Sequence, residues 1–252
     1  GAYDPFCAIS EVCKSENLWM HVDAAWGGWA LLSPATRNKY CQGIELADSL
    51  TFDPHKFMGQ ALQCAVFLTR HKGLLQACNQ QRAAYLFQPD KNNTHLDIGD
   101  KTIMCGRKGD AFKLWLSWKH RGDTGWAKEA ERAEALSAWF EAKVSDSSDP
   151  RFALALPRSG CNICFWVIPS ALRTAQQKYD HQTSDEATRE ILHKVAPKVK
   201  DAMQKGGDAQ IGFQVVLGLP NCFRIVLPSC SRVRQESLEK MLDRMSLLAD
   251  AL

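Results

Sequence analysis

The sequence predicts an α/β domain with a mostly parallel sheet, followed by a smaller α+β domain. Residues 1–120 alternate short apolar runs with amphipathic stretches, a rhythm that is typical of βα units. A long helical stretch begins at Ala111 and is interrupted at Gly122 and Gly125. The residues after it show separated apolar runs and two further helices, which favours an antiparallel sheet with helices. We therefore predict domains at residues 1–122 and 123–252.

The elements of the first domain are predicted from helix caps and apolar periodicity. Asp4 is predicted to cap a helix that has Pro5 in its first turn. The apolar stripe of this helix is formed by Phe6, Ile9, Val12 and Cys13. Strand and helix signals then alternate: a strand at 18–22, a helix from 33 to about 43, a strand at 49–52, an apolar run at 61–69 and a helix that begins within 74–78.

The second domain is predicted to contain three strands and two helices. The strands correspond to the apolar runs 161–168, 211–217 and 222–227. Thr183-x-x-Glu186 has the pattern of a capping box at the start of a helix, and Pro197 interrupts that helix. The last helix runs to the C-terminus, with an apolar face formed by Leu238, Met241, Leu242, Met245, Leu248 and Leu252.

Composition and charge exclude several classes of function. The chain has 252 residues, 45% of them hydrophobic and 23% charged, and a formal net charge of +3. So small a net positive charge does not favour nucleic-acid binding. No apolar run approaches the roughly 18 residues of a membrane span, and no signal peptide is recognisable, so we expect a cytoplasmic protein without a membrane span. Because the chain begins with Gly1 rather than Met, we also expect a fragment of a longer protein.

The ten cysteines raise the alternative of a zinc site. They are scattered, and only Cys161 and Cys164 have the CxxC spacing. This pair lies in an apolar run that reads as a strand, where alternation places the two side chains on opposite faces. We therefore expect no metal, and cysteines that serve as small buried side chains in a reduced protein.

Two predicted strand ends carry residues suited to chemistry. Asp23 ends the first strand, and Lys56 follows the second in the segment Asp53-Pro54-His55-Lys56. Ligands of open α/β sheets lie beyond the carboxyl ends of the strands. A lysine and a carboxylate there suit pyridoxal phosphate, because its aldehyde binds a lysine amine and its ring nitrogen needs an anion to stay protonated. The alternative is a surface salt bridge between Asp23 and Lys56, which would contribute little.

These segments, in this order, resemble the group II pyridoxal-phosphate-dependent decarboxylases of the aspartate-aminotransferase-like fold (fold type I). That family includes glutamate, cysteine sulfinate, aspartate and aromatic amino-acid decarboxylases. The similarity extends over nearly the whole chain. It is carried by the segments 1–5, 18–28, 62–64, 85–91, 99–101, 105–107, 162–166 and 223–224. The resemblance implies pyridoxal 5'-phosphate as cofactor and a large domain of which residues 1–122 form the C-terminal part.

The resemblance also implies roles around the cofactor. Lys56 matches the Schiff-base lysine, Asp23 the partner of the pyridinium nitrogen, and Ala25 the residue that packs on the ring. His55 matches a residue near the phosphate, although a structural histidine is the alternative. Many relatives have Asn where this chain has Asp53, and we assign no binding role to Asp53 because its carboxylate would repel phosphate.

Three further residues match functional positions of the family. Tyr85 matches a proton donor in a mobile loop that covers the neighbouring subunit's active site, which implies a homodimer with shared active sites; aromatic packing is the alternative. Arg224 matches the residue that binds the distal acid group of the substrate, and the alternative is an arginine on the solvent face. Gly106 matches a loop at the dimer interface.

The resemblance implies α-decarboxylation of a small acidic amino acid. The segment 85–91 is closest to glutamate decarboxylases, which predicts conversion of L-glutamate to 4-aminobutyrate and carbon dioxide. Cysteine sulfinate or aspartate is the alternative substrate, since Arg224 suits all three acids. A non-catalytic, dimerising fragment is the alternative of another class, because no Gly/Ser-rich phosphate loop precedes Asp23.

Overall fold

The computed structural model describes residues 1–81, 83, 85, 90, 92–104, 106, 108–173, 179–227 and 233–252. These residues form two compact units. The N-terminal unit comprises Asp4–Gly28 and Cys41–Gly122, and the C-terminal unit comprises Gly1–Tyr3, Trp29–Tyr40 and Asp123–Leu252. The N-terminal unit ends at Gly122, which is also where the predicted first domain ends. Unlike in the prediction, residues 1–3 and 29–40 belong to the C-terminal unit.

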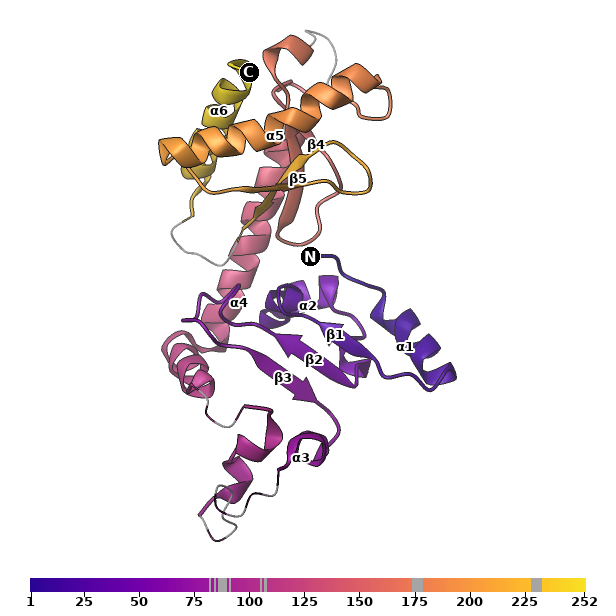
Figure 1. The fold of residues 1–252 in the computed structure, drawn as a ribbon, viewed down its shortest axis with the longest axis vertical. Helices are drawn as coiled ribbons and strands as arrows, with labels where there is room; N and C mark the ends of the chain where they lie inside the picture. Colours follow the sequence, from indigo (N-terminus) through magenta and orange to yellow (C-terminus); the bar gives the residue numbers. More distant parts are fainter. Residues whose placement is uncertain are drawn as a thin grey trace. The chain divides into compact units, whose positions relative to one another are not determined.

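The N-terminal unit is built on a three-stranded mixed sheet in the order β1-β2-β3 (Figure 1). Strand β1 is His21–Asp23, β2 is Ser49–Phe52 and β3 is Val66–Thr69. Strands β1 and β2 are parallel, whereas β2 and β3 are antiparallel. The predicted parallel pairing is therefore present at β1 and β2, and the third strand reverses direction.

The helices of this unit are short. They are α1 (Phe6–Ser15) and α3 (Leu74–Asn79), with 3-10 turns η2 (Ile44–Leu46), η3 (Thr94–Leu96) and η4 (Gly99–Lys101). The small core beside β1 consists of Phe6, Met20, Val22 and Ala24. Two predictions for α1 are wrong. Pro5 rather than Asp4 is the N-cap, because the chain turns into the helix one residue later, and Val12 lies on the solvent side.

Helix α4 (Asp110–Ser145) contains the predicted break at Gly122, whose φ of 68° lies in the left-handed region. Glycine adopts this conformation without the steric cost that a Cβ atom would bring. Gly125, three residues later, does not break the helix. The part before the break belongs to the N-terminal unit and the part after it to the C-terminal unit.

The C-terminal unit contains a four-stranded antiparallel sheet in the order β4-β5-β7-β6. Its strands are β4 (Phe152–Leu154), β5 (Asn162–Val167), β6 (Gly212–Gln214) and β7 (Cys222–Val226). Its remaining elements are α2 (Pro34–Tyr40), α5 (Glu186–Gly206), α6 (Gln235–Asp250) and η5 (Ser170–Leu172), and η1 (Gly27–Leu32) precedes α2. The sequence did not predict β4.

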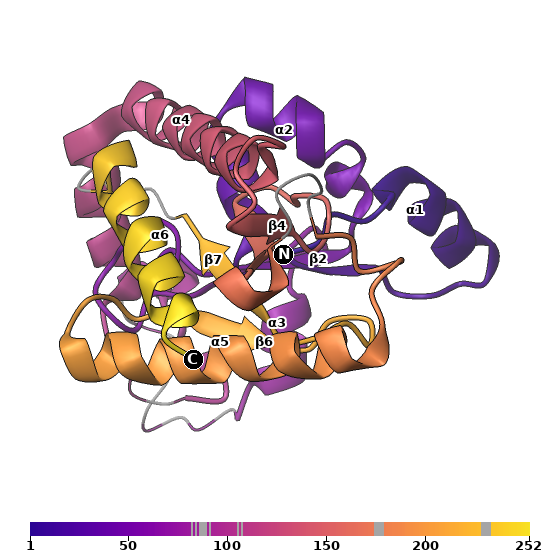
Figure 2. The same ribbon diagram turned by 90° about the horizontal axis from the view of Figure 1, so that it is seen from above.

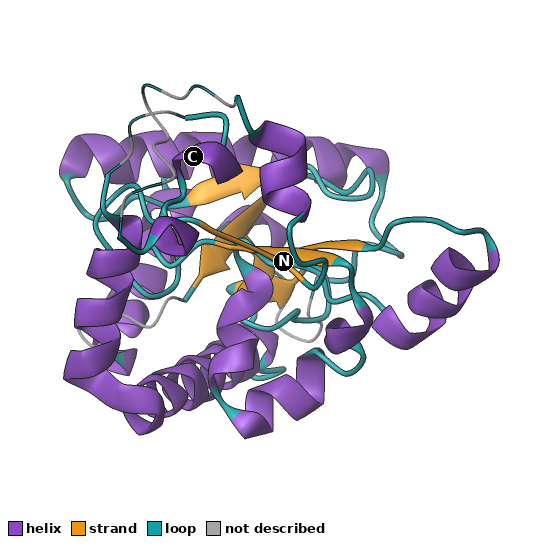
Figure 3. Ribbon diagram, turned by 90° about the horizontal axis from the view of Figure 1, so that it is seen from below, coloured by secondary structure: helices purple, strands orange, loops and turns teal. Residues whose placement is uncertain are grey.

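One face of this sheet forms the main core. Ile163, Phe165 and Phe223 are fully buried, and Phe140 of α4 packs edge-on against Phe165 with ring centroids 5.4 Å apart. Helices α5 and α6 contact each other and β5 (Figure 2). Figure 3 shows the helices and strands of the described residues, as a mixed α/β fold requires. None of the described helices has the length and apolar character needed to cross a membrane.

Helix α5 continues through Pro197, which the sequence could not explain. Proline has no N–H to donate to the carbonyl four residues earlier, that of His193. The Asn221 side chain donates to this carbonyl instead, at 2.8 Å. The predicted capping box is wrong, since the N-cap is Asp185, whose carboxylate accepts from the Thr188 N–H at 2.8 Å.

Candidate functional site

The candidate site lies in the N-terminal unit, at the carboxyl ends of the parallel strands β1 and β2. Asp23 is the last residue of β1, and Asp53 follows directly after β2. The Asp53 N–H donates to the Ala25 carbonyl at 3.3 Å, so the segments after the two strands lie side by side. The structure thus brings the two predicted segments to one edge of the sheet.

Asp23 is exposed at this edge. Its Oδ1 accepts a hydrogen bond from the Ala25 N–H at 3.0 Å, which orients the carboxylate. The chain then turns, and the Gly28 N–H donates to the Ala24 carbonyl at 2.8 Å. A Cβ atom at Gly28 would lie 2.5 Å from the Phe52 ring, so only glycine allows this turn to pack so closely on β2.

Lys56 lies in a turn that begins at Asp53, where the Lys56 N–H donates to the Asp53 carbonyl at 2.8 Å. Its Nζ forms an ion pair with Asp53 Oδ2 at 2.9 Å. The salt bridge with Asp23, which the sequence left open, is therefore replaced by one with Asp53. The side chain of Lys56 is 41% exposed, and that of Asp53 is 15% exposed. Lys56 is accessible to a ligand, whereas the carboxylate beside it is largely buried.

His55 is hydrogen-bonded to the backbone of the following loop. Its Nδ1 lies 2.7 Å from the Cys64 carbonyl oxygen, and its Nε2 lies 3.9 Å from Asp53 Oδ2. A carbonyl oxygen can only accept, so the short contact places a proton on Nδ1. This bond fixes the ring beside Lys56, with Nε2 directed toward the Asp53 carboxylate.

His21, for which no role was predicted from the sequence, shares a sheet face with Asp23. Its Nδ1 lies 2.7 Å from Ser49 Oγ and its Nε2 lies 2.9 Å from Thr51 Oγ1. The alternation of His21 and Asp23 in one strand is the signal that could have placed both on the same face. Both ring nitrogens are engaged with hydroxyl groups of β2, so His21 joins the two strands at the candidate site.

The other predicted residues belong to other segments of the chain. Tyr85 is 81% exposed, and Gly106 is exposed as well. Residues 86–89 of the same loop motif, and its end at 91, lie outside the described residues. Arg224 belongs to β7, where its Cα pairs with Cys164 of β5 and Gly212 of β6. It is exposed and forms no ion pair with any residue that the structure describes.

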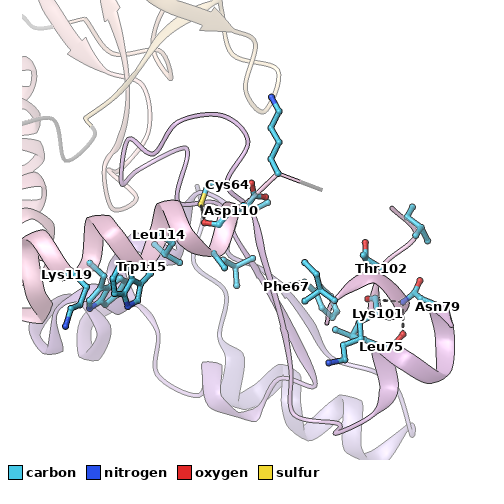
Figure 4. Close-up of a pocket in the computed structure, with 18 residues that line it drawn as sticks. Cys64, Phe67, Leu75, Asn79, Lys101, Thr102, Asp110, Leu114, Trp115 and Lys119 are labelled. Carbon is cyan, nitrogen blue, oxygen red and sulfur yellow. Dashed lines mark hydrogen bonds between the residues drawn. The ribbon is translucent and has the colours of Figure 1, made fainter. Parts of the chain in front are cut away.

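The N-terminal unit also contains a pocket of about 920 Å³ between β3, α3 and the start of α4 (Figure 4). Side chains of α4, among them Leu114 and Trp115, lie on one side, and Phe67 and Leu75 lie on the other. Neither Asp23 nor Lys56 lines it. We place the candidate site at the strand ends, because the charged groups gather there and the pocket walls are mostly apolar.

Within the described residues, no three His, Cys, Asp or Glu side chains are grouped to hold a metal ion. Cys161 is buried, and burial raises the pKa of its thiol to about 12. Cys164 is only half-buried, and a hydrogen bond with Cys222 lowers the pKa of Cys164 to about 7. The two residues of the CxxC motif therefore lie in different environments.

Comparison with known proteins relates this arrangement to one family. The pyridoxal-dependent decarboxylase conserved domain matches residues 1–168. Glutamate decarboxylase of Drosophila melanogaster is 38% identical over 254 aligned residues, which cover 100% of this chain and 48% of that protein. The chain thus spans about half the length of this curated relative.

Solved structures give the same relation. The crystal structure of mouse CSAD matches with a TM-score of 0.89 and 35% identity, covering 100% of this chain and 50% of the mouse chain. Tryptophan decarboxylase of Catharanthus roseus, in complex with L-tryptophan, matches with a TM-score of 0.76 and 26% identity, covering 99% of this chain and 46% of that one. The predicted fold type and the predicted resemblance are confirmed by these matches.

Proposed function

Because the chain belongs to the pyridoxal-dependent decarboxylase family, we propose that it performs α-decarboxylation of a small acidic amino acid as part of a cytoplasmic enzyme. Membership confirms pyridoxal phosphate as the predicted cofactor class. We propose L-glutamate as substrate and 4-aminobutyrate and carbon dioxide as products. The 38% identity to a glutamate decarboxylase over the whole chain supports this choice.

The observation that carries the proposal is that Asp23 ends β1 and Lys56 follows β2, so both lie at the same end of two adjacent parallel strands. A lysine accessible to an aldehyde and an oriented carboxylate beyond adjacent parallel strands fit pyridoxal phosphate. When bound, this cofactor supplies a ring that accepts the electron pair released at the substrate α-carbon.

In this proposal each residue at the edge has one task. Lys56 binds the cofactor aldehyde through Nζ. Asp23 holds a proton on the pyridine nitrogen, because a carboxylate stabilises the cationic ring nitrogen. Ala25 offers a small side chain against which a flat ring packs, and His55 is fixed by the Cys64 carbonyl in the position from which it borders the cofactor.

Two residues act on the substrate. Tyr85 donates the phenolic proton to the α-carbon after carbon dioxide leaves, and its exposure is compatible with a loop that reaches another subunit in a homodimer with shared active sites. Arg224 binds the distal acid through its planar guanidinium. An exposed arginine without an ion pair among the described residues is available for such a ligand.

Reductive trapping tests the cofactor site. Pyridoxal phosphate is added to the protein, the Schiff base is reduced with borohydride, and peptides are mapped by mass spectrometry. We expect the pyridoxyl group on Lys56 and none in Lys56→Ala. A label on another lysine with equal yield in Lys56→Ala contradicts the proposal.

Substrate choice is tested with Arg224→Ala and Arg224→Lys. A planar guanidinium binds a carboxylate through two parallel hydrogen bonds, so we expect a raised KM for glutamate in Arg224→Ala and little rescue by lysine, whose ammonium lacks that geometry. Parallel assays with glutamate, cysteine sulfinate and aspartate rank the three acids, and the similarity to mouse CSAD is the reason to include the second. Labelling of Lys56 without carbon dioxide release from any of them would favour the non-catalytic, dimerising alternative.

A further inference from the structure

Asp53 received no role from the sequence, yet it makes the shortest charged contact of the candidate site. Its Oδ2 lies 2.9 Å from Lys56 Nζ. The Asp53 side chain is 15% exposed, so water solvates this carboxylate poorly. A carboxylate in such a place is stabilised chiefly by the cation beside it.

His55 does not replace Lys56 as that cation. Its Nδ1 proton is donated to the Cys64 carbonyl, at 2.7 Å. In the neutral ring, Nε2 then carries a lone pair and cannot donate to Asp53. The 3.9 Å between Nε2 and Oδ2 is also too long for a hydrogen bond. Lys56 is therefore the hydrogen-bonding cation of the Asp53 carboxylate.

We infer that Asp53 is a positioning residue that keeps a proton on Lys56 Nζ. A neutral nitrogen at Nζ would leave the Asp53 carboxylate without its cation, whereas a charged nitrogen keeps the pair. Asp53 thus stabilises the ammonium of the free lysine and, by the same interaction, the protonated imine that Lys56 forms with an aldehyde. The second part rests on the proposed function, and the first does not.

The proton balance of imine formation agrees with this role. The Lys56 ammonium first releases a proton to solvent, and the neutral amine adds to the aldehyde carbon. A carbon–nitrogen bond forms, the carbonyl oxygen leaves as water, and the imine nitrogen takes a proton back. The net change is ammonium plus aldehyde to protonated imine plus water. Asp53 therefore faces a cation before and after imine formation. It disfavours only the neutral amine and the neutral imine that occur between these two states.

Acylation of the free protein tests the first part. Only a neutral amine reacts with acetic anhydride, so Asp53→Asn, which removes the charge and keeps the shape, is expected to increase acetylation of Lys56 at pH 7 by roughly three- to tenfold. The rate is read from the Lys56 peptide by mass spectrometry. Asp53→Glu keeps the charge and is expected to return the rate toward that of the wild type.

The chain offers a matched control pair. Asp110 and Lys113 form the same i,i+3 ion pair in the same unit, with 3.2 Å between Oδ1 and Nζ. Asp110→Asn is expected to increase acetylation of Lys113 and to leave that of Lys56 unchanged. If Asp53→Asn acetylates Lys56 at the wild-type rate, or if Asp110→Asn changes Lys56 equally, the inference is overturned.

Absorbance of the protein loaded with pyridoxal phosphate tests the second part. The protonated imine absorbs at longer wavelength than the neutral imine, so Asp53→Asn is expected to lower the long-wavelength fraction at a fixed pH. An unchanged fraction, with Lys56 carrying the label in reductive trapping, contradicts the inference and leaves the proposed function intact. A label elsewhere removes the proposed function, and the acetylation result still decides whether Asp53 protects Lys56.

Discussion

The two units of the chain differ in how exposed the charged side chains of Asp23, Lys56 and Arg158 are. In the N-terminal unit, Asp23 and Lys56 are exposed at the carboxyl ends of β1 and β2. In the C-terminal unit, Arg158 is buried to 9% exposure, and its guanidinium donates to Glu134 at 3.0 Å and to Glu141 at 2.9 Å. The accessible charges of Asp23 and Lys56 can meet a ligand, whereas the enclosed guanidinium of Arg158 is bound to carboxylates of its own unit.

The enclosed network of the C-terminal unit is fully engaged. Glu134 also accepts hydrogen bonds from Lys39 at 2.6 Å and from the Tyr40 hydroxyl at 2.8 Å. These contacts join α2 to α4 and to the segment before β5. The comparison indicates that stability is concentrated in the C-terminal unit and chemistry in the N-terminal unit, which mutations in each can test.

The largest expected effect is on the main core. Phe165→Ala removes a fully buried ring of β5 and should lower the free energy of unfolding by about 3–5 kcal/mol. Hydrogen exchange of the β5 and β7 peptides measures this locally. The matched variant Phe67→Ala in β3, where the ring is 44% exposed, should cost about 1 kcal/mol or less. Equal losses of unfolding free energy in Phe165→Ala and Phe67→Ala would contradict the conclusion that stability is concentrated in the C-terminal unit.

A smaller effect is expected from the ion network. Glu134→Gln keeps the shape but leaves Arg158 with Glu141 as its remaining carboxylate, so we expect a loss of about 2–3 kcal/mol. Denaturant unfolding at pH 7 measures it. Lys205 and Asp201 form an exposed pair in the same unit, and Asp201→Asn should change stability by less than about 0.5 kcal/mol.

The same network predicts a pH dependence. Burial raises the pKa of Glu134, but hydrogen bonds from Arg158, Lys39 and Tyr40 outweigh it and hold the pKa below the ordinary 4.5. A lowered folded-state pKa gives stability that is complete above the unfolded-state pKa and is lost as the pH falls from about 5 toward the folded-state value. Glu134→Gln should flatten this part of the stability profile, and an unchanged slope would contradict the assignment.

The smallest effect on stability is expected at the open edge. Asp23→Asn replaces an exposed carboxylate and should change the free energy of unfolding by less than about 0.5 kcal/mol. In the proposed enzyme the same substitution should retain cofactor but remove most of the turnover, because a neutral partner no longer holds a proton on the ring nitrogen. A large loss of unfolding free energy in Asp23→Asn, together with normal turnover, would contradict the assignment of Asp23 to chemistry and not to stability.

Local patterns predicted much of the fold. The bounds of β2 at Ser49–Phe52 agree with the predicted strand 49–52, and Gly122 interrupts α4 as expected. These features depend on nearest neighbours in the chain, namely a short apolar run or a backbone angle that glycine tolerates. The N-cap at Asp185 was missed because Thr183 and Asp185 are both residue types that favour the N-cap position, and residue type alone does not distinguish them.

Contacts between distant residues escaped prediction. Pro197 is tolerated in α5 because Asn221 satisfies the carbonyl of His193, 28 positions earlier in the chain. Tertiary packing encloses the side chain of Arg158 between Glu134 and Glu141, which lie 24 and 17 positions earlier in the chain. Such partners cannot be read from spacing, since many chain paths would be compatible with the same residues.

The sequence by itself determined the family, because several motifs occur in the order typical of it. It also determined that Asp23 and Lys56 lie at or just after the ends of two successive strands, and parallel strands bring such residues to the same end of the sheet. Only the tertiary structure decided which acid pairs with Lys56. The turn after β2 folds Lys56 back onto Asp53, three residues earlier, and encloses that carboxylate, whereas Asp23 remains exposed with its Oδ1 bonded to the Ala25 N–H. The burial and the direction of a side chain depend on the surrounding chain. These two properties distinguish Asp53, which is paired with Lys56, from Asp23, which stays exposed.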